Sequence, residues 1–150
     1  MIGFGITKTP PFILEKIENL CNLLLKGKRE YEQVASVVPD KDLRRTILTL
    51  AQESNQYACE LFSQIQSLGG ITQEEKTDES ECELDIKVLT DENEILSFCK
   101  MNEKKMVSAY REILNESFIY EGLRKMIRYQ LNGILCAFMQ LKLLSSLRVN

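Results

Sequence analysis

Histidine and tryptophan are absent from this 150-residue chain, and only three prolines occur. Histidine is the usual acid–base group at neutral pH and the commonest metal ligand in proteins. Its absence excludes a Ser-His-Asp triad, a Cys-His dyad and histidine-ligated zinc or haem. The composition therefore points to no catalytic residue and to no cofactor.

The chain also lacks an excess of either charge. Nineteen Lys and Arg stand against 22 Asp and Glu, which leaves a formal net charge of -3. This balance gives no electrostatic reason to expect nucleic acid or an anionic membrane. The most apolar late segment, Ile134–Met139, is far too short to cross a bilayer. We expect no nucleic acid and no membrane as partners.

Cysteine is present but without a recognisable pairing pattern. The five cysteines form an odd set without a C-x-x-C pair, and Cys82 lies in the acidic stretch over 71–90. The other four fall among apolar residues of helical stretches: Cys21, Cys59, Cys99 and Cys136. Such residues are expected to be reduced, buried small hydrophobes. Reduced thiols favour a cytoplasmic location.

Four stretches carry apolar residues at alternating spacings of four and three, which lines one face of a helix. We predict one all-α domain over residues 1–150, with an N-terminal arm over 1–11 and helices over 12–38, 41–68, 91–116 and 120–147. Asp40 and Thr90 are the predicted N-caps of the second and third helices. Gly69 and Gly70 are the predicted stop of the second helix.

The two kinds of connection constrain the topology. Short connections make the first and second helices one antiparallel hairpin, and the third and fourth another. The acidic link over 71–90 could reach about 65 Å when extended, whereas a helix of 28 residues is about 42 Å long. We therefore predict a ferritin-like four-helix bundle, with two antiparallel hairpins joined by a long crossover. An up-down-up-down bundle is also allowed, but it does not need so long a link.

Each apolar stripe is interrupted near its middle by one small or polar residue. These residues are Gly27, Ser54, Asn102 and Gln130. Since the midpoints of two antiparallel hairpins share one layer, we predict a polar bundle centre at Ser54, Asn102 and Gln130. These side chains would bond one another or a buried water, and would fix the helix register.

A ferritin-like di-iron site would occupy the same layer. It needs a Glu from each of two helices and a Glu-x-x-His from each of the other two. Glu30, Glu53 and Glu103 are the carboxylates available, and Gln56 stands where the first histidine would be. The fourth helix has no carboxylate in its middle. We predict no metal site; any metal would have to use these three carboxylates.

Several short motifs carry a resemblance to a known family. They are Ala51-Gln52-Glu53, Glu60-Leu61-Phe62, Leu68-Gly69-Gly70, Ala109-Tyr110-Arg111-Glu112-Ile113-Leu114 and Gln130. Over residues 12–148 the chain resembles a bacterial ferritin-like family known only as a domain of unknown function. The resemblance implies two long helical hairpins with a crossover. Relatives often carry a histidine in the second half of the fourth helix, where this chain has Phe138.

The fourth helix carries a second apolar stripe at Leu131, Leu135 and Phe138. A wide apolar face of this kind is either buried deep within the bundle or part of a subunit interface, and we favour a homodimer through that helix. The expected function is a non-enzymatic structural or interaction module. One alternative is a degenerate metal-binding or oxidoreductase-like protein using Glu30 and Glu53 with Glu103. Another is a small-molecule carrier that uses the bundle centre.

Overall fold

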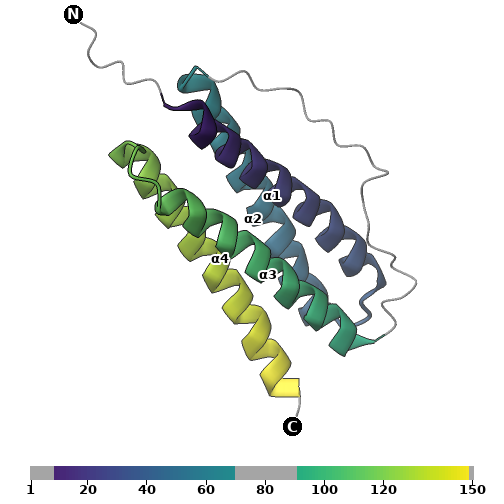
Figure 1. Ribbon diagram of the computed structural model, residues 1–150. Helices are drawn as coiled ribbons and strands as arrows, with labels where there is room; N and C mark the ends of the chain where they lie inside the picture. Colours follow the sequence, from purple (N-terminus) through teal and green to yellow (C-terminus); the bar gives the residue numbers. More distant parts are fainter. Residues whose placement is uncertain (1–8, 70–90, 149–150) are drawn as a thin grey trace, which may run out of the picture.

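The computed structural model describes residues 9–69 and 91–148 and shows four α-helices, with no strand in those residues (Figure 1). The helices are α1 (Pro11–Val37), α2 (Lys41–Ser67), α3 (Glu92–Leu114) and α4 (Glu121–Arg148). The predicted all-helical structure is confirmed for these residues, and each helix begins and ends within two residues of the expected positions. The predicted acidic link over 71–90 and most of the predicted arm over 1–11 lie outside the described residues.

Local signals explain where α2 begins and ends. The Asp40 side chain accepts a hydrogen bond from the Leu43 backbone N–H at 3.1 Å, which confirms the predicted N-cap. Past the other end of α2, Gly69 adopts a φ of +83°, the left-handed conformation that glycine takes without steric cost.

The start of α3 corrects one prediction. Its N-cap is Asp91, one residue later than the predicted Thr90, and the Asp91 carboxylate accepts from the Glu94 backbone N–H at 2.8 Å. Both residue types cap helices well, so the sequence offered two adjacent candidates. A carboxylate at this position also interacts favourably with the positive end of the helix dipole.

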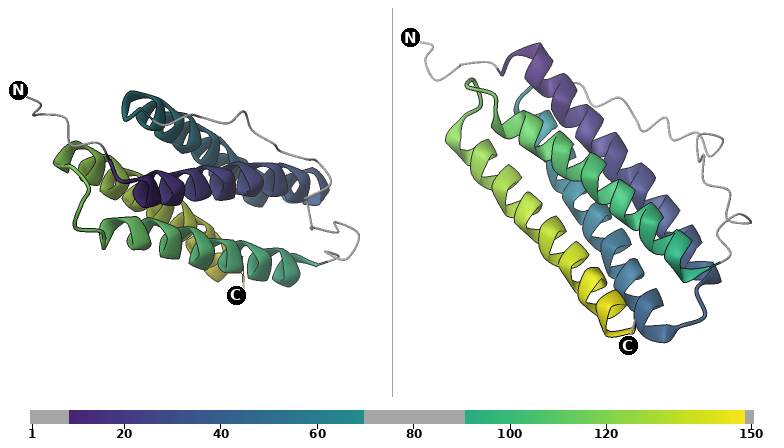
Figure 2. Two further views of the ribbon diagram at one scale, coloured as in Figure 1. Left: turned by 45° about the horizontal axis from the view of Figure 1, so that its top comes forward. Right: turned by 60° about the horizontal axis from the view of Figure 1, so that its bottom comes forward.

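Contacts near the helix ends establish their directions. Lys16, in the second turn of α1, lies 2.7 Å from a carboxylate oxygen of Glu116, just past the end of α3. The Tyr120 hydroxyl, just before α4, donates to the Gln64 side chain in the last turn of α2. One end of the bundle therefore holds the starts of α1 and α4 and the ends of α2 and α3. Hence α2 and α3 run in one direction, and α1 and α4 in the other (Figure 2).

The packing order around the bundle is α1, α2, α4, α3. Helix α1 packs against α2 and α3, and α4 packs against the same two helices. Helices α1 and α4 are therefore diagonal, and their side chains meet in the core. The Tyr31 ring lies 6.1 Å from the Phe98 ring and 6.4 Å from the Phe138 ring, edge-on in both cases. These aromatic contacts join α1 to α3 and α4.

The predicted dimer stripe on α4 belongs to the core of the chain itself. Leu131 is 8% exposed and Phe138 is 1% exposed, while Leu135 is half-buried against the same core. Because α4 packs against both α2 and α3, it needs a wider apolar face than one seam provides. This stripe is therefore not a free interface. No described helix has an apolar stretch long enough to span a membrane.

The cysteines are less uniformly buried than expected. Cys21 and Cys99 are buried in the core, but Cys59 and Cys136 are exposed on α2 and α4, and Cys82 lies outside the described residues. The prediction of burial is therefore wrong for Cys59 and Cys136. Apolar neighbours in the sequence did not determine which side of the helix each thiol occupies.

Candidate functional site

Gln130 of α4 is a buried polar residue whose side chain makes three hydrogen bonds. Its side-chain amide donates to the Tyr57 backbone carbonyl at 3.2 Å and to a carboxylate oxygen of Glu60 at 2.9 Å. Its carbonyl oxygen accepts from the Tyr110 hydroxyl at 2.9 Å. Gln130 has no exposed surface, and its partners belong to α2 and α3. One glutamine thus joins three helices, and we call Gln130, Tyr57, Glu60 and Tyr110 the Gln130 cluster.

Burial keeps the Tyr110 hydroxyl of this cluster protonated. It raises the pKa of Tyr110 far above the usual range of a phenol, so this hydroxyl is a neutral donor at any physiological pH. Glu60 is half-buried and accepts a second hydrogen bond, at 3.2 Å, from the Gln56 side-chain amide. Both polar atoms of the Gln130 side-chain amide and the Tyr110 hydroxyl therefore have hydrogen-bond partners.

Gly133 makes room for the cluster. A Cβ atom at this position would overlap the Tyr57 hydroxyl oxygen, so only glycine lets the Tyr57 side chain lie against α4. The Tyr57 ring also meets the Tyr129 ring edge-on, with centroids 6.3 Å apart. A glycine inside a helix costs about 1 kcal/mol relative to alanine. A glycine in the middle of a predicted helix was therefore the sequence signal for the close approach of Tyr57 to α4. The predictions from sequence did not include Gly133.

The predicted bonding among Ser54, Asn102 and Gln130 is not present in the described residues. All three are buried, but Gln130 bonds the residues of its own cluster. The Ser54 hydroxyl and the Asn102 side-chain nitrogen have no hydrogen-bond partner there. The three residues thus form no common network.

Different heights along the bundle explain this result. A Cβ at Gly27 would lie 2.5 Å from the end of the Met106 side chain. Gln130 contacts Tyr110, four residues further along α3, while Asn102 lies four residues before Met106. Four residues are about one helical turn, or about 5.4 Å. Gly27, Asn102 and Gln130 therefore lie at successive heights along the bundle rather than in one layer.

Asn102 belongs to a second polar region, shared with Glu30 and Tyr31 of α1. Burial raises the pKa of both Glu30 and Tyr31, while the nearby Asn102 side chain lowers it in each case. In the described residues the Tyr31 hydroxyl has no hydrogen-bond partner. This region has buried polar atoms that are not fully satisfied, in contrast to the Gln130 cluster.

The three candidate metal ligands are not brought together. Lys142 holds both carboxylate oxygens of Glu103, at 3.0 and 3.1 Å, while Glu30 lies near Asn102. Glu53 is on α2, which is diagonal to the α3 helix of Glu103. No group of three or more Asp, Glu, Cys or His side chains in the described part of the chain could hold a metal ion. The donor set does not fit a di-iron group.

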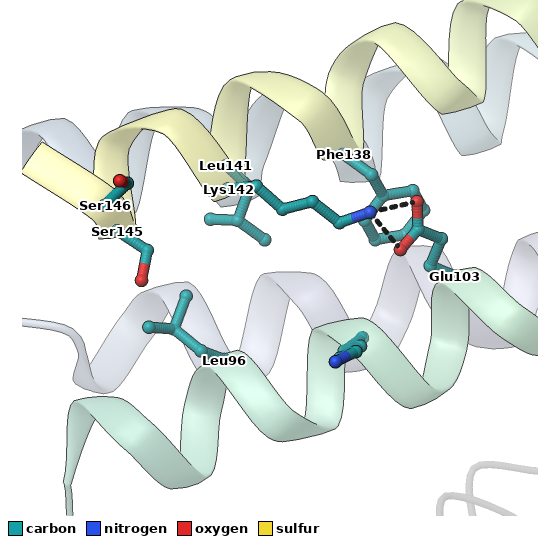
Figure 3. A pocket seen from close by; sticks show the side chains of 8 residues that line it. Leu96, Glu103, Phe138, Leu141, Lys142, Ser145 and Ser146 are labelled. Carbon is teal, nitrogen blue, oxygen red and sulfur yellow. Dashed lines mark hydrogen bonds and ion pairs between the residues drawn. The ribbon is translucent and has the colours of Figure 1, made fainter.

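A pocket of about 290 Å³ opens between α3 and α4, beside the first half of α3 and the last turns of α4 (Figure 3). It is lined by Leu96, Lys100, Glu103, Phe138, Leu141, Lys142, Ser145 and Ser146. Figure 3 shows the Lys142 side chain reaching to Glu103, with Ser145 and Leu96 away from that ion pair. The pocket lies nearer the end of α4 than Gln130, so it differs from the predicted ligand site at the bundle centre.

Comparison with known proteins places the chain in a family. A family model described as domain of unknown function (DUF2383) matches residues 13–116, more than half of the chain. The chain belongs to this family. No curated protein matches the sequence. The DUF2383 match covers α1, α2 and α3. Gln130, Gly133 and the α4 side of the pocket lie beyond it, so their roles must be argued from their own contacts.

Proposed function

We propose that this protein is a non-enzymatic, ferritin-like interaction module that associates through α4. The helix arrangement supports the ferritin-like part of the proposal. Two antiparallel hairpins pack so that α2 and α3 run in the same direction, and Gly69 and Asp91 fall at opposite ends of the bundle. Ferritin-like bundles share this order, in which one long connection joins two hairpins. The mutual bonding of the Gln130 cluster supports a structural role for the polar centre.

The observation that carries the interaction proposal is an apolar stripe on the outside of α4. We call Tyr129, Cys136, Met139, Leu143 and Leu147 the outer stripe. Its four large members are between 59% and 76% exposed, and Cys136 between them is also exposed. Tyr129, Cys136 and Leu143 are seven residues apart, the repeat that places side chains along a helix–helix seam. Several large apolar side chains exposed along one helix face favour an interface at that face.

We propose a second copy of the chain as the partner. In a two-fold dimer the same surface of each subunit forms the interface. The outer stripes of two chains would therefore bury each other, and no other protein would be needed. The stripe extends over eighteen residues of helical rise, about 27 Å, which is long enough for two α4 helices to pack along each other. The homodimer expected from sequence is thus retained, with the outer stripe in place of Leu131, Leu135 and Phe138.

We also propose a cytoplasmic location, which the free thiols support. In the two described ranges, Cys21, Cys59, Cys99 and Cys136 are all free. Free thiols, two of them exposed, support a reducing cytoplasmic compartment.

Light scattering after size-exclusion chromatography at micromolar concentration tests the dimer. The expected mass is about twice the 17.3-kDa chain. Leu143→Glu should give the single-chain mass, because it puts a charge in the middle of the outer stripe. Met101→Glu is the matched control, since Met101 is 51% exposed on α3 and lies outside the stripe. A wild-type protein with single-chain mass, or a dimeric Leu143→Glu variant, would contradict the proposal.

A further inference from the structure

We propose that the pocket between α3 and α4 binds a medium-chain carboxylate, with its carboxylate group at Lys100 and its apolar chain on Phe138 and Leu141. This site uses a different set of side chains from the outer stripe, so it goes beyond the proposed function.

The floor of the pocket is apolar and rigidly held. Phe138 and Leu141 are almost fully buried, and Phe138 is fixed by its edge-on contact with Tyr31. Leu96 adds a half-buried aliphatic wall. The volume of about 290 Å³ is near the lower end of the range for ligand sites, which begins at about 300 Å³. The space therefore fits one small molecule with an apolar body.

The polar wall favours an anion. Lys142 is neutralised by Glu103, to which it is bound through both carboxylate oxygens (Figure 3). Lys100 is exposed and takes part in none of the ion pairs among residues 9–69 and 91–148. It lies one turn after Leu96 on the same face of α3. Among the residues that line the pocket, two lysines therefore stand against one acid, Glu103.

Hydroxyl groups complete the polar wall. Ser145 and Ser146 of α4 line the pocket from the side opposite α3. A serine hydroxyl can donate to a carboxylate, and an ammonium group adds a charge-assisted hydrogen bond. An amphiphile with one negative charge matches the whole lining. A cationic amphiphile of the same length would face Lys100 and Lys142 at the rim.

Titration calorimetry with octanoate on the full chain tests this inference. We expect one site per chain, about tenfold weaker binding to Lys100→Gln, and no binding of octylammonium, since a charge-assisted hydrogen bond contributes about a factor of ten or more. Lys104→Gln is the matched control, because Lys104 is an exposed lysine of α3 outside this pocket. Ser145→Phe should abolish binding by filling the space, with folding checked by its thermal transition.

Absence of octanoate binding to the wild-type chain would overturn the inference. Equal affinities of wild type and Lys100→Gln, or equal binding of octylammonium, would do the same. The Leu143→Glu variant separates the two proposals, because it should lose the dimer and keep the octanoate site.

Discussion

Replacing Gln130 by leucine perturbs the buried polar centre without a large change in side-chain size. The change removes the two hydrogen bonds from the Gln130 amide to α2 and the one that it accepts from Tyr110. Glu60 is half-buried and keeps its bond from Gln56. The Tyr110 hydroxyl is fully buried and loses the acceptor that it has in the wild-type structure.

The expected cost follows from these contacts. An orphaned buried hydroxyl costs about 2 kcal/mol, and the two lost amide bonds about 1 kcal/mol each. Burying leucine in place of glutamine recovers about 2 kcal/mol of hydrophobic free energy. Gln130→Leu should therefore lower the free energy of unfolding by about 2 kcal/mol.

A double-mutant cycle with Tyr110→Phe isolates the interaction. Tyr110→Phe alone should cost about 1 kcal/mol, because it leaves the Gln130 carbonyl oxygen unpaired. In the double variant neither the Tyr110 hydroxyl nor the Gln130 carbonyl is present to be left unpaired. Its destabilisation should therefore be about 1–2 kcal/mol smaller than the sum of the two single effects. Urea unfolding followed by circular dichroism measures all four proteins. A Gln130→Leu variant more stable than wild type, with additive effects, would refute the role of Gln130 as a structural pin.

Three further predictions concern packing, pH and thiol chemistry. Gly133→Ala should destabilise the chain by about 1–3 kcal/mol in urea unfolding, because its Cβ would overlap the Tyr57 hydroxyl, and Tyr57→Phe in the same background should relieve part of this cost. Burial raises the pKa of Glu30, so the folded chain holds this proton more tightly than the unfolded chain does. The resulting stabilisation of the fold is complete below the unfolded pKa of about 4.3 and is lost as the pH rises through the folded pKa. Unfolding measured from pH 4 to 7 should show a smaller loss of stability in Glu30→Gln, and parallel curves would contradict this. In a Cys82→Ser variant only Cys59 and Cys136 should react quickly with a thiol reagent. Burial raises the pKa of the core thiols Cys21 and Cys99 to about 12, which keeps them unreactive. Fast reaction of all four thiols would disprove the packing.

The helices were predictable because their determinants are local. Repeating apolar positions, Asp40 as a cap and Gly69 as a stop all act within a few residues of the chain. The choice between Thr90 and Asp91 was not predictable, since adjacent residues with similar capping ability differ only in the final geometry. The pairing of α1 with α2 followed from their short connection.

The candidate site was predictable only in part because it depends on the relative heights of helices. Periodicity identifies Gln130 as a core position, but it does not specify which residue of a neighbouring helix lies at the same level. Tyr110 therefore became its partner instead of Asn102. The apolar face of α4 is wide because some of its residues pack against α2 and α3 and others form the exposed outer stripe. Spacing in the sequence does not separate these two sets, so Phe138 was predicted at the interface although it lies in the core.

Native mass spectrometry of the full chain, purified without chelator, tests the central claim most directly. One spectrum reports both the number of chains and any bound metal. The proposed function predicts a two-chain species without stoichiometric metal, and Leu143→Glu should convert it to a single-chain species. A single-chain species carrying stoichiometric iron or manganese, lost in a Glu53→Ala variant, would contradict it.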